Sequence, residues 1–184
     1  QPNATDESIG VSGGAGNFAL STGEIDLLTN GFSSITIGRS DSTALMTINA
    51  DTFLDPITFR MGGASGDITT VGALVTSNLA MTFTAGTGTG ATFTQGDGSS
   101  TIATGSGNIT ITTDVIVLNT TADTITGTGT ITLQPAAVAF TIGLGGGSGF
   151  GHCRVAHRPV GCDQRQQSNE QYAERCQHRQ IPAV

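Results

Sequence analysis

The side chains best suited to chemistry are gathered near the end of this 184-residue chain, and all three cysteines and all three histidines belong to this group. Thiolate and imidazole groups are the usual ligands of tetrahedral zinc, and a neighbouring cysteine and histidine can act as a nucleophile and its base. The pattern Cys-x8-Cys-x13-Cys-x-His lacks the closely paired ligands of zinc knuckles, and no third group would orient the histidine. We expect no metal, cofactor or catalytic site among His152, Cys153, His157, Cys162, Cys176 and His178.

Three glycine- or asparagine-containing motifs have simpler explanations than binding. The segment GGAGNFALS (13–21) resembles a calcium-binding coil, but Phe18 stands where the ligand aspartate is needed. The segment GTGTG (86–90) is followed by no helical pattern, which a dinucleotide fingerprint requires. Glycines in tight turns explain both segments. Glycosylation sequons begin at Asn3, Asn108 and Asn119, as chance produces in threonine-rich sequence.

The aspartates are spread singly beside glycine, serine or threonine, as turn-forming residues are; they are Asp41, Asp51, Asp55, Asp67, Asp97, Asp114 and Asp123. Incidental binding of calcium by these surface aspartates remains an alternative. A polysaccharide-active enzyme would need clustered carboxylates with basic groups close by. Because the first 150 residues contain only Arg39 and Arg60 as bases, we predict that the chain is not an enzyme. A polysaccharide-active fragment remains an alternative.

Threonine pairs of the form Thr-x-Thr suggest a second alternative, ice binding by a flat array of hydroxyl and methyl groups. The pairs begin at residues 82, 87, 92, 110, 124, 128 and 130. These starts do not keep one period, whereas a regular array should repeat once per coil. Threonine also suits strands in general, so the sequence alone does not favour the array.

Composition excludes two classes of partner. Residues 1–150 carry eleven acids and two bases, and the chain has no lysine. This segment has too few cationic side chains to neutralise the phosphates of a nucleic acid, so we expect no nucleic acid partner. No apolar stretch approaches the roughly 20 residues of a membrane helix, so we expect no membrane insertion.

Short runs rich in β-branched residues alternate with turns, and several keep a strict period of two, which predicts strands. In NITITT, for example, Ile109 and Ile111 alternate with Thr110 and Thr112. Helical spacing occurs only in STGEIDLL (21–28), which predicts a helical turn or a loop. The predicted strands are 33–40, 44–50, 56–61, 67–76, 79–85, 91–95, 108–120, 123–134 and 138–144. With about 20 residues per coil they would form about seven stacked coils, with unpaired edges at both ends.

An internal repeat defines the organisation. Residues 1–16 (QPNATDESIGVSGGAG) align without a gap on residues 134–149 (QPAAVAFTIGLGGGSG), with eight identities and an offset of 133. We therefore expect residues 1–149 to be one repeat unit plus the start of the next. Residues 150–184 depart from the repeat and form a separate tail: an out-of-frame or foreign segment is favoured, and a polar, disordered terminus is the alternative.

The segments GFSSITIGRSD (31–41), ADTITGTGTITLQP (122–135) and TIGLGGGSG (141–149) resemble motifs of filamentous-haemagglutinin-like, β-strand-repeat surface proteins of bacteria. The resemblance implies a right-handed parallel β-helix (β-solenoid) and export to the medium or the cell surface, in association with the outer membrane. It implies a non-enzymatic adhesin stalk or structural rod. Its partners would be neighbouring repeats of the same parent chain and surface glycans or host and matrix surfaces. It carries over no catalytic residue.

Overall fold

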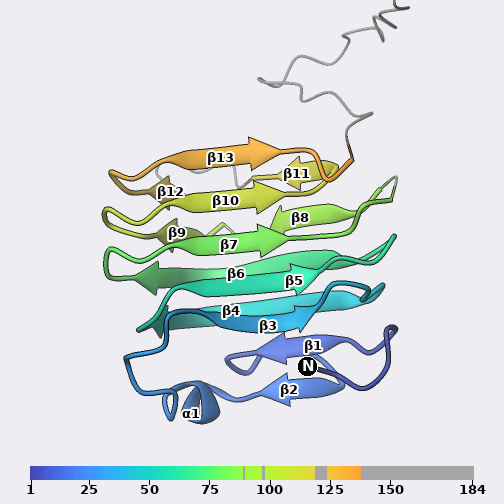
Figure 1. Cartoon of the computed structure of the whole chain (residues 1–184), viewed down its shortest axis with the longest axis horizontal. Coiled ribbons are helices and arrows are strands. Elements are labelled where there is room, and N and C mark those ends of the chain that lie inside the picture. Colours follow the sequence, from blue (N-terminus) through green and yellow to red (C-terminus); the bar gives the residue numbers. More distant parts are fainter. Residues whose placement is uncertain (89, 97, 119–123, 138–184) are drawn as a thin grey trace, which may run out of the picture. The chain divides into compact units, whose positions relative to one another are not determined.

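The computed structural model describes residues 1–88, 90–96, 98–118 and 124–137, which all belong to a unit spanning residues 1–144. Within them the protein consists of thirteen strands and one short helix (Figure 1). Every strand pairing is parallel. The prediction of an all-β fold is therefore confirmed. The tail and most of the second copy of the repeat lie outside the described residues.

Most strands are only three to five residues long. They are β1 (Ile9–Val11), β2 (Phe18–Leu20), β3 (Ile35–Arg39), β4 (Leu45–Phe53), β5 (Ile57–Met61), β6 (Asp67–Thr76), β7 (Met81–Thr84), β8 (Thr92–Gln95), β9 (Thr101–Ala103), β10 (Ile109–Thr112), β11 (Val115–Val117), β12 (Ile125–Thr126) and β13 (Ile131–Gln134). The helix α1 (Thr22–Ile25) is a single turn. The predicted runs 108–120 and 123–134 each contain two strands, and β1, β2 and β9 were not predicted.

The strands form two sheets. Sheet A contains β1, β2, β4, β6, β8, β9, β11 and β12, and sheet B runs in the order β13-β10-β7-β5-β3. From β3 onward the chain passes back and forth between the sheets. Each strand of sheet B therefore pairs with the strand of sheet B that follows it in the sequence (Figure 1). Each passage through sheet B adds one layer to the stack.

The pairing offsets in sheet B are longer than the predicted coil of about 20 residues. Ile35 lies opposite Ile57, followed by Met81, Ile109 and Ile131, so successive offsets are 22, 24, 28 and 22 residues. Within the described residues sheet B therefore has five layers and the main path of sheet A has six, both fewer than the seven coils estimated for residues 1–150.

Sheet A is bent into two halves. The register between β4 and β6 shifts between Asn49 and Asp51, and Gly72 adopts a φ of 81° at the same level of β6. On one side of this bend β6 pairs with β8, and on the other it pairs with β9. The single long strand β6 therefore contributes to both halves of sheet A.

The core is built from alternate side chains of both sheets. In β5, for example, Ile57, Phe59 and Met61 are buried, and the residues that alternate with them are a half-buried threonine and an exposed arginine. The ring of Phe59 lies 5.4 Å from those of Phe53 and Phe83, and the Phe83 ring lies 4.9 Å from that of Phe93. Since Phe53 and Phe93 belong to sheet A and the other two to sheet B, this cluster joins the sheets.

The sequence led us to expect an unpaired edge at the N-terminal end of the stack, but part of this end is covered. β2 pairs with β1 on the side away from β4, and Ile25 of α1 is buried in the core. A capping box begins the helix: the Ser21 side chain accepts from the Glu24 amide, and the Ser21 amide donates to the Glu24 carboxylate. The hydrogen bond from the Ser21 amide lowers the pKa of Glu24.

Candidate functional surface

Sheet B carries an unbroken column of threonines on its outward face. The five residues stand opposite one another in the parallel ladder, one per layer, and they alternate with inward-facing apolar residues. Neighbouring strands of a sheet are about 4.8 Å apart, so the hydroxyl and methyl groups repeat at this spacing. The column consists of Thr36, Thr58, Thr82, Thr110 and Thr132.

A second outward column runs beside the first and is more varied. Thr84 and Thr112 stand opposite each other within it, and the Gln134 side-chain amide donates to the Thr112 hydroxyl over 3.0 Å. The pairs 82/84 and 110/112 therefore stack directly, although their starts are 28 residues apart. The expectation that irregular spacing keeps the pairs from forming an array is wrong for these two. The extra residues between them form β8 and β9 of sheet A.

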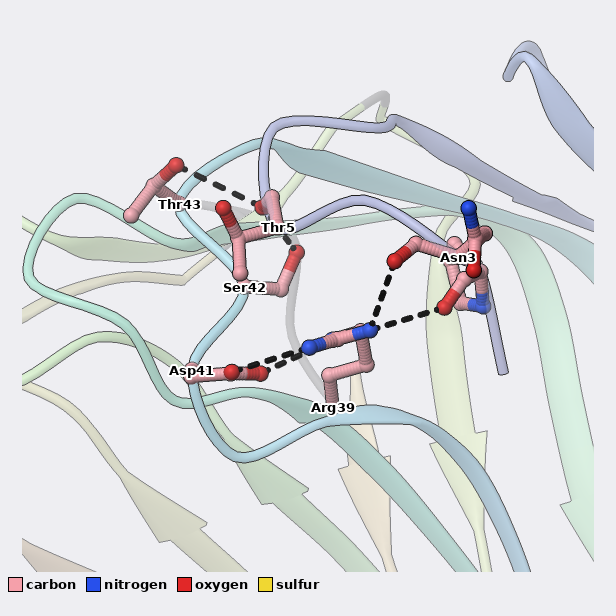
Figure 2. A network of polar contacts seen from close by, with 7 residues as sticks. Asn3, Thr5, Arg39, Asp41, Ser42 and Thr43 are labelled. Atoms are coloured by element: carbon pink, nitrogen blue, oxygen red, sulfur yellow. Dashed lines mark hydrogen bonds and ion pairs between the residues drawn. The ribbon is translucent and has the colours of Figure 1, made fainter.

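Arg39, at the end of β3, fastens the N-terminal segment to the stack (Figure 2). Its Nη1 donates to the carbonyl oxygens of Pro2 and Asn3 over 3.0 and 3.1 Å. Its Nε and Nη2 donate to the two carboxylate oxygens of Asp41 over 2.8 and 2.9 Å. This bidentate contact raises the pKa of Arg39 and lowers the pKa of Asp41. We refer to Pro2, Asn3, Arg39 and Asp41 as the N-terminal clasp.

Next to the clasp, the Thr5 carbonyl oxygen accepts three further hydrogen bonds (Figure 2). The Thr43 amide donates over 2.8 Å, and the hydroxyls of Ser42 and Thr43 donate over 3.1 and 3.4 Å. Sequence reasoning did not find this network. The available signal was one arginine followed two positions later by an aspartate, in a body with only one other base.

The described aspartates do not form a cluster, and two of them are not the turn residues that the sequence predicted: Asp51 lies within β4 and Asp67 begins β6. Asp51 accepts from the Ser12 hydroxyl and from the Thr52 amide. Asp67 accepts from the amide and the hydroxyl of Thr92, over 2.7 and 3.0 Å. In these contacts the carboxylates join strands β4 and β6 to segments that are distant in the sequence. Asp97 and Asp123 lie outside the described residues.

Asp55 has a more buried position, since only 2% of its surface is exposed. One carboxylate oxygen accepts from the Gly31 amide over 2.9 Å, while the other has no partner among the described residues. The residue borders an open hollow of about 540 Å³, to which Phe32 and Leu54 also contribute. Both Asp114 carboxylate oxygens are likewise buried without a partner in the described part of the chain.

The glycine-rich segment after β1 supports close backbone contacts. A Cβ atom on Gly14 would lie 2.1 Å from the Thr47 carbonyl oxygen, and one on Gly10 would lie 1.9 Å from that of Gly14. Phe18, which replaces the expected calcium ligand, begins β2. Within GTGTG, a Cβ on Gly88 would lie 2.2 Å from the Ala64 carbonyl oxygen. Glycine is needed at these contacts because nothing larger fits.

Only some of the other residues considered from the sequence belong to the described part of the chain. The Asn108 side chain accepts from the Thr130 amide over 2.9 Å, so it takes part in a turn. Asn119 and all the cysteines and histidines, including the Cys162/His157 pair, lie outside the described residues. Among the residues that the structure does describe, no group of three or more histidine, cysteine or acidic side chains could hold a metal ion.

No family model, curated protein or solved structure matches this chain significantly. No helix in the described ranges has the length and apolar character needed to span a bilayer.

Proposed function

We propose that the chain is a non-enzymatic segment of a secreted bacterial repeat protein and serves as an adhesin stalk or surface rod. Its fold would be a right-handed parallel β-solenoid, extended by neighbouring repeats of the same parent chain. The observation that carries this proposal is the constant register of sheet B, in which five layers present the same inward and outward columns. Sheet B can be lengthened layer by layer without redesigning its core, whereas in sheet A a preceding repeat would have to displace β2 from its place beside β1.

Surface glycans or host and matrix surfaces are the partners we propose for the rod, and the cell surface is its location. A repeated face presents the same weakly binding groups many times, so attachment comes from multivalency rather than from one pocket. The unbroken threonine column offers a hydroxyl donor and acceptor in every layer of sheet B. This assignment draws on the same column and on the resemblance of the sequence to surface repeat proteins.

The experiment is to place one or two copies of residues 1–133 ahead of the full chain and to measure particle length by electron microscopy. A rod predicts a constant increment per copy of about 24 Å, since five layers are each about 4.8 Å apart. A control with flexible glycine-serine linkers between copies should give separate particles at variable distances. Separate particles without the linkers would overturn the proposal.

Ice binding is a second candidate, and one observation favours it: the pairs Thr82/Thr84 and Thr110/Thr112 stack in register on sheet B. Their methyl and hydroxyl groups form a small, regular patch. Thermal hysteresis of the full chain measures this activity. Thr110→Tyr should abolish it by breaking the flat patch, whereas Thr94→Tyr, on β8 of sheet A, should not. Absence of hysteresis in the unaltered chain would exclude the candidate.

A further inference from the structure

Strand β3 is the end of sheet B among the described residues, and half of its backbone groups face away from the sheet. The Ile35 amide donates to the Pro56 carbonyl oxygen, and the Arg39 carbonyl oxygen accepts from the Gly62 amide. Residues 35, 37 and 39 thus bond to β5. Since bonding alternates along a strand, the amide and carbonyl groups of Thr36 point to the other side. An edge of this kind can receive another strand.

The N-terminal segment runs beside β3 and β4 at a constant offset. β1 pairs with β4 at an offset of 37 residues, as in the pair Ile9/Met46. The hydrogen bond from the Thr43 amide to the Thr5 carbonyl oxygen is the one that this same offset requires in a parallel ladder. Backbone pairing thus shows the offset from residue 5 to residue 11. The Arg39 side chain bonds to the carbonyl oxygens of Pro2 and Asn3, so the first residues lie beside the end of β3.

The internal repeat supplies the residues that stand before this segment in a tandem arrangement. Gln134 is the equivalent of Gln1, so a preceding copy contributes its β13 strand immediately ahead of Gln1. Its Ile131 falls three positions before Gln1, and the offset of 37 places it opposite Ile35. We propose that the free edge of β3 is the docking site for the segment Ile131–Leu133 of a second copy of the repeat.

The side chains of the two segments match in this register. The sequence Ile-Thr-Leu of the incoming strand meets Ile-Thr-Ile of β3. Thr132 of the incoming copy lies beside Thr36, which extends the outward threonine column by one layer. The two apolar residues lie beside Ile35 and Ile37, and so continue the inward columns of sheet B. A shift of one residue would turn the apolar side chains outward.

The backbone groups match as well. In β13, the carbonyl oxygens of Thr130 and Gln134 accept from the amides of Ile109 and Thr113 in and after β10. By the same alternation, the backbone groups of Ile131 point away from β10. In the proposed register they face the amide and carbonyl groups of Thr36, which point away from β5. Both edges therefore present complementary donors and acceptors at the same positions.

The docked strand would extend sheet B only, because β2 already lies beside β1 in sheet A. The inference rests on the proposed function, since its partner is a neighbouring repeat, and it adds the strand and register of the junction. It also gives the clasp a role: Arg39 fixes the first residues after the junction against the end of β3.

The test adds five residues, Gly-Thr-Ile-Thr-Leu, before Gln1 of the full chain. The matched control adds Gly-Ile-Thr-Leu-Thr, which has the same composition with apolar and polar positions exchanged. We expect the first extension to slow hydrogen exchange of the Thr36 amide by about tenfold or more, and the control to leave it unchanged. Equal exchange rates in the two extended chains would overturn the docking site.

The outcomes separate this inference from the proposed function. If tandem copies form lengthening rods but the Thr36 amide is not protected, the junction is wrong and the rod stands. If tandem copies remain separate particles while the five-residue extension still protects Thr36, the edge binds this segment but the rod is wrong. Failure of both experiments rejects both proposals.

Discussion

At the scale of single residues, Gly38 shows how the close stacking of backbones restricts the sequence. Its φ is 108°, in the left-handed region, and a Cβ atom there would lie 1.9 Å from the Arg60 carbonyl oxygen. Both the conformation and the space exclude any other side chain. Gly38 stands opposite Arg60 in the second, more varied column of sheet B, so the threonine column beside it stays unbroken.

The clasp predicts a pH dependence of stability. Because Arg39 lowers the pKa of Asp41 below its ordinary value of 3.8, the folded state favours the ionised carboxylate. The resulting stabilisation is present above the unfolded pKa and is lost as the pH falls through the folded value. Asp41→Asn should therefore cause a small fall in the urea midpoint at pH 7, and the difference from the unaltered chain should shrink as the pH falls through the ordinary range of aspartate and vanish below the lowered pKa of Asp41.

Asp6→Asn is the control for this prediction, since Asp6 is an exposed carboxylate in the same N-terminal segment. It removes the same charge without touching the clasp. A fall in the midpoint that is equal for both variants, or that persists at low pH for Asp41→Asn, would show that the pair does not stabilise the fold.

At the scale of elements, the period of two was sufficient to predict most of the strands. It works because one side of each strand faces the core and the other faces solvent, as in β5 and β10. It failed for β1 and β9, which have three residues each and are too short to show a period. It also joined β10 to β11, because no glycine or proline marks the turn between them at residues 113–114.

The outward columns could be predicted only in part. Counting along the sequence suggested that the threonine pairs have no common period. Register, however, is set by which residues enter each strand, and turns of different length absorb the difference. The sequence therefore contained the Ile-Thr-Ile type of pattern in each strand of sheet B, but not the assignment of β8 and β9 to the other sheet. That assignment depends on contacts between distant residues.

At the scale of the described stack, each layer contacts mainly the layers before and after it. In such an arrangement stability is a sum of layers and of the interfaces between neighbours. A residue in a middle layer contributes to two interfaces, and one in an end layer to one. The cost of a substitution should therefore depend on its place in the stack as well as on its size.

Phe83 and Leu133 test this dependence, because they occupy the same inward column. Phe83 is fully buried and contacts Phe59 and Phe93, so Phe83→Ala should lower the free energy of unfolding by about 3–5 kcal/mol. Leu133, half-buried in the end layer with Ile111 on one side, should lose only about 1 kcal/mol on truncation to alanine. Urea denaturation measures both, with the outward-facing Thr82→Ala as control. Equal costs for the two apolar residues would contradict a layered stack, because they would require the end of sheet B to be as fully covered as its middle.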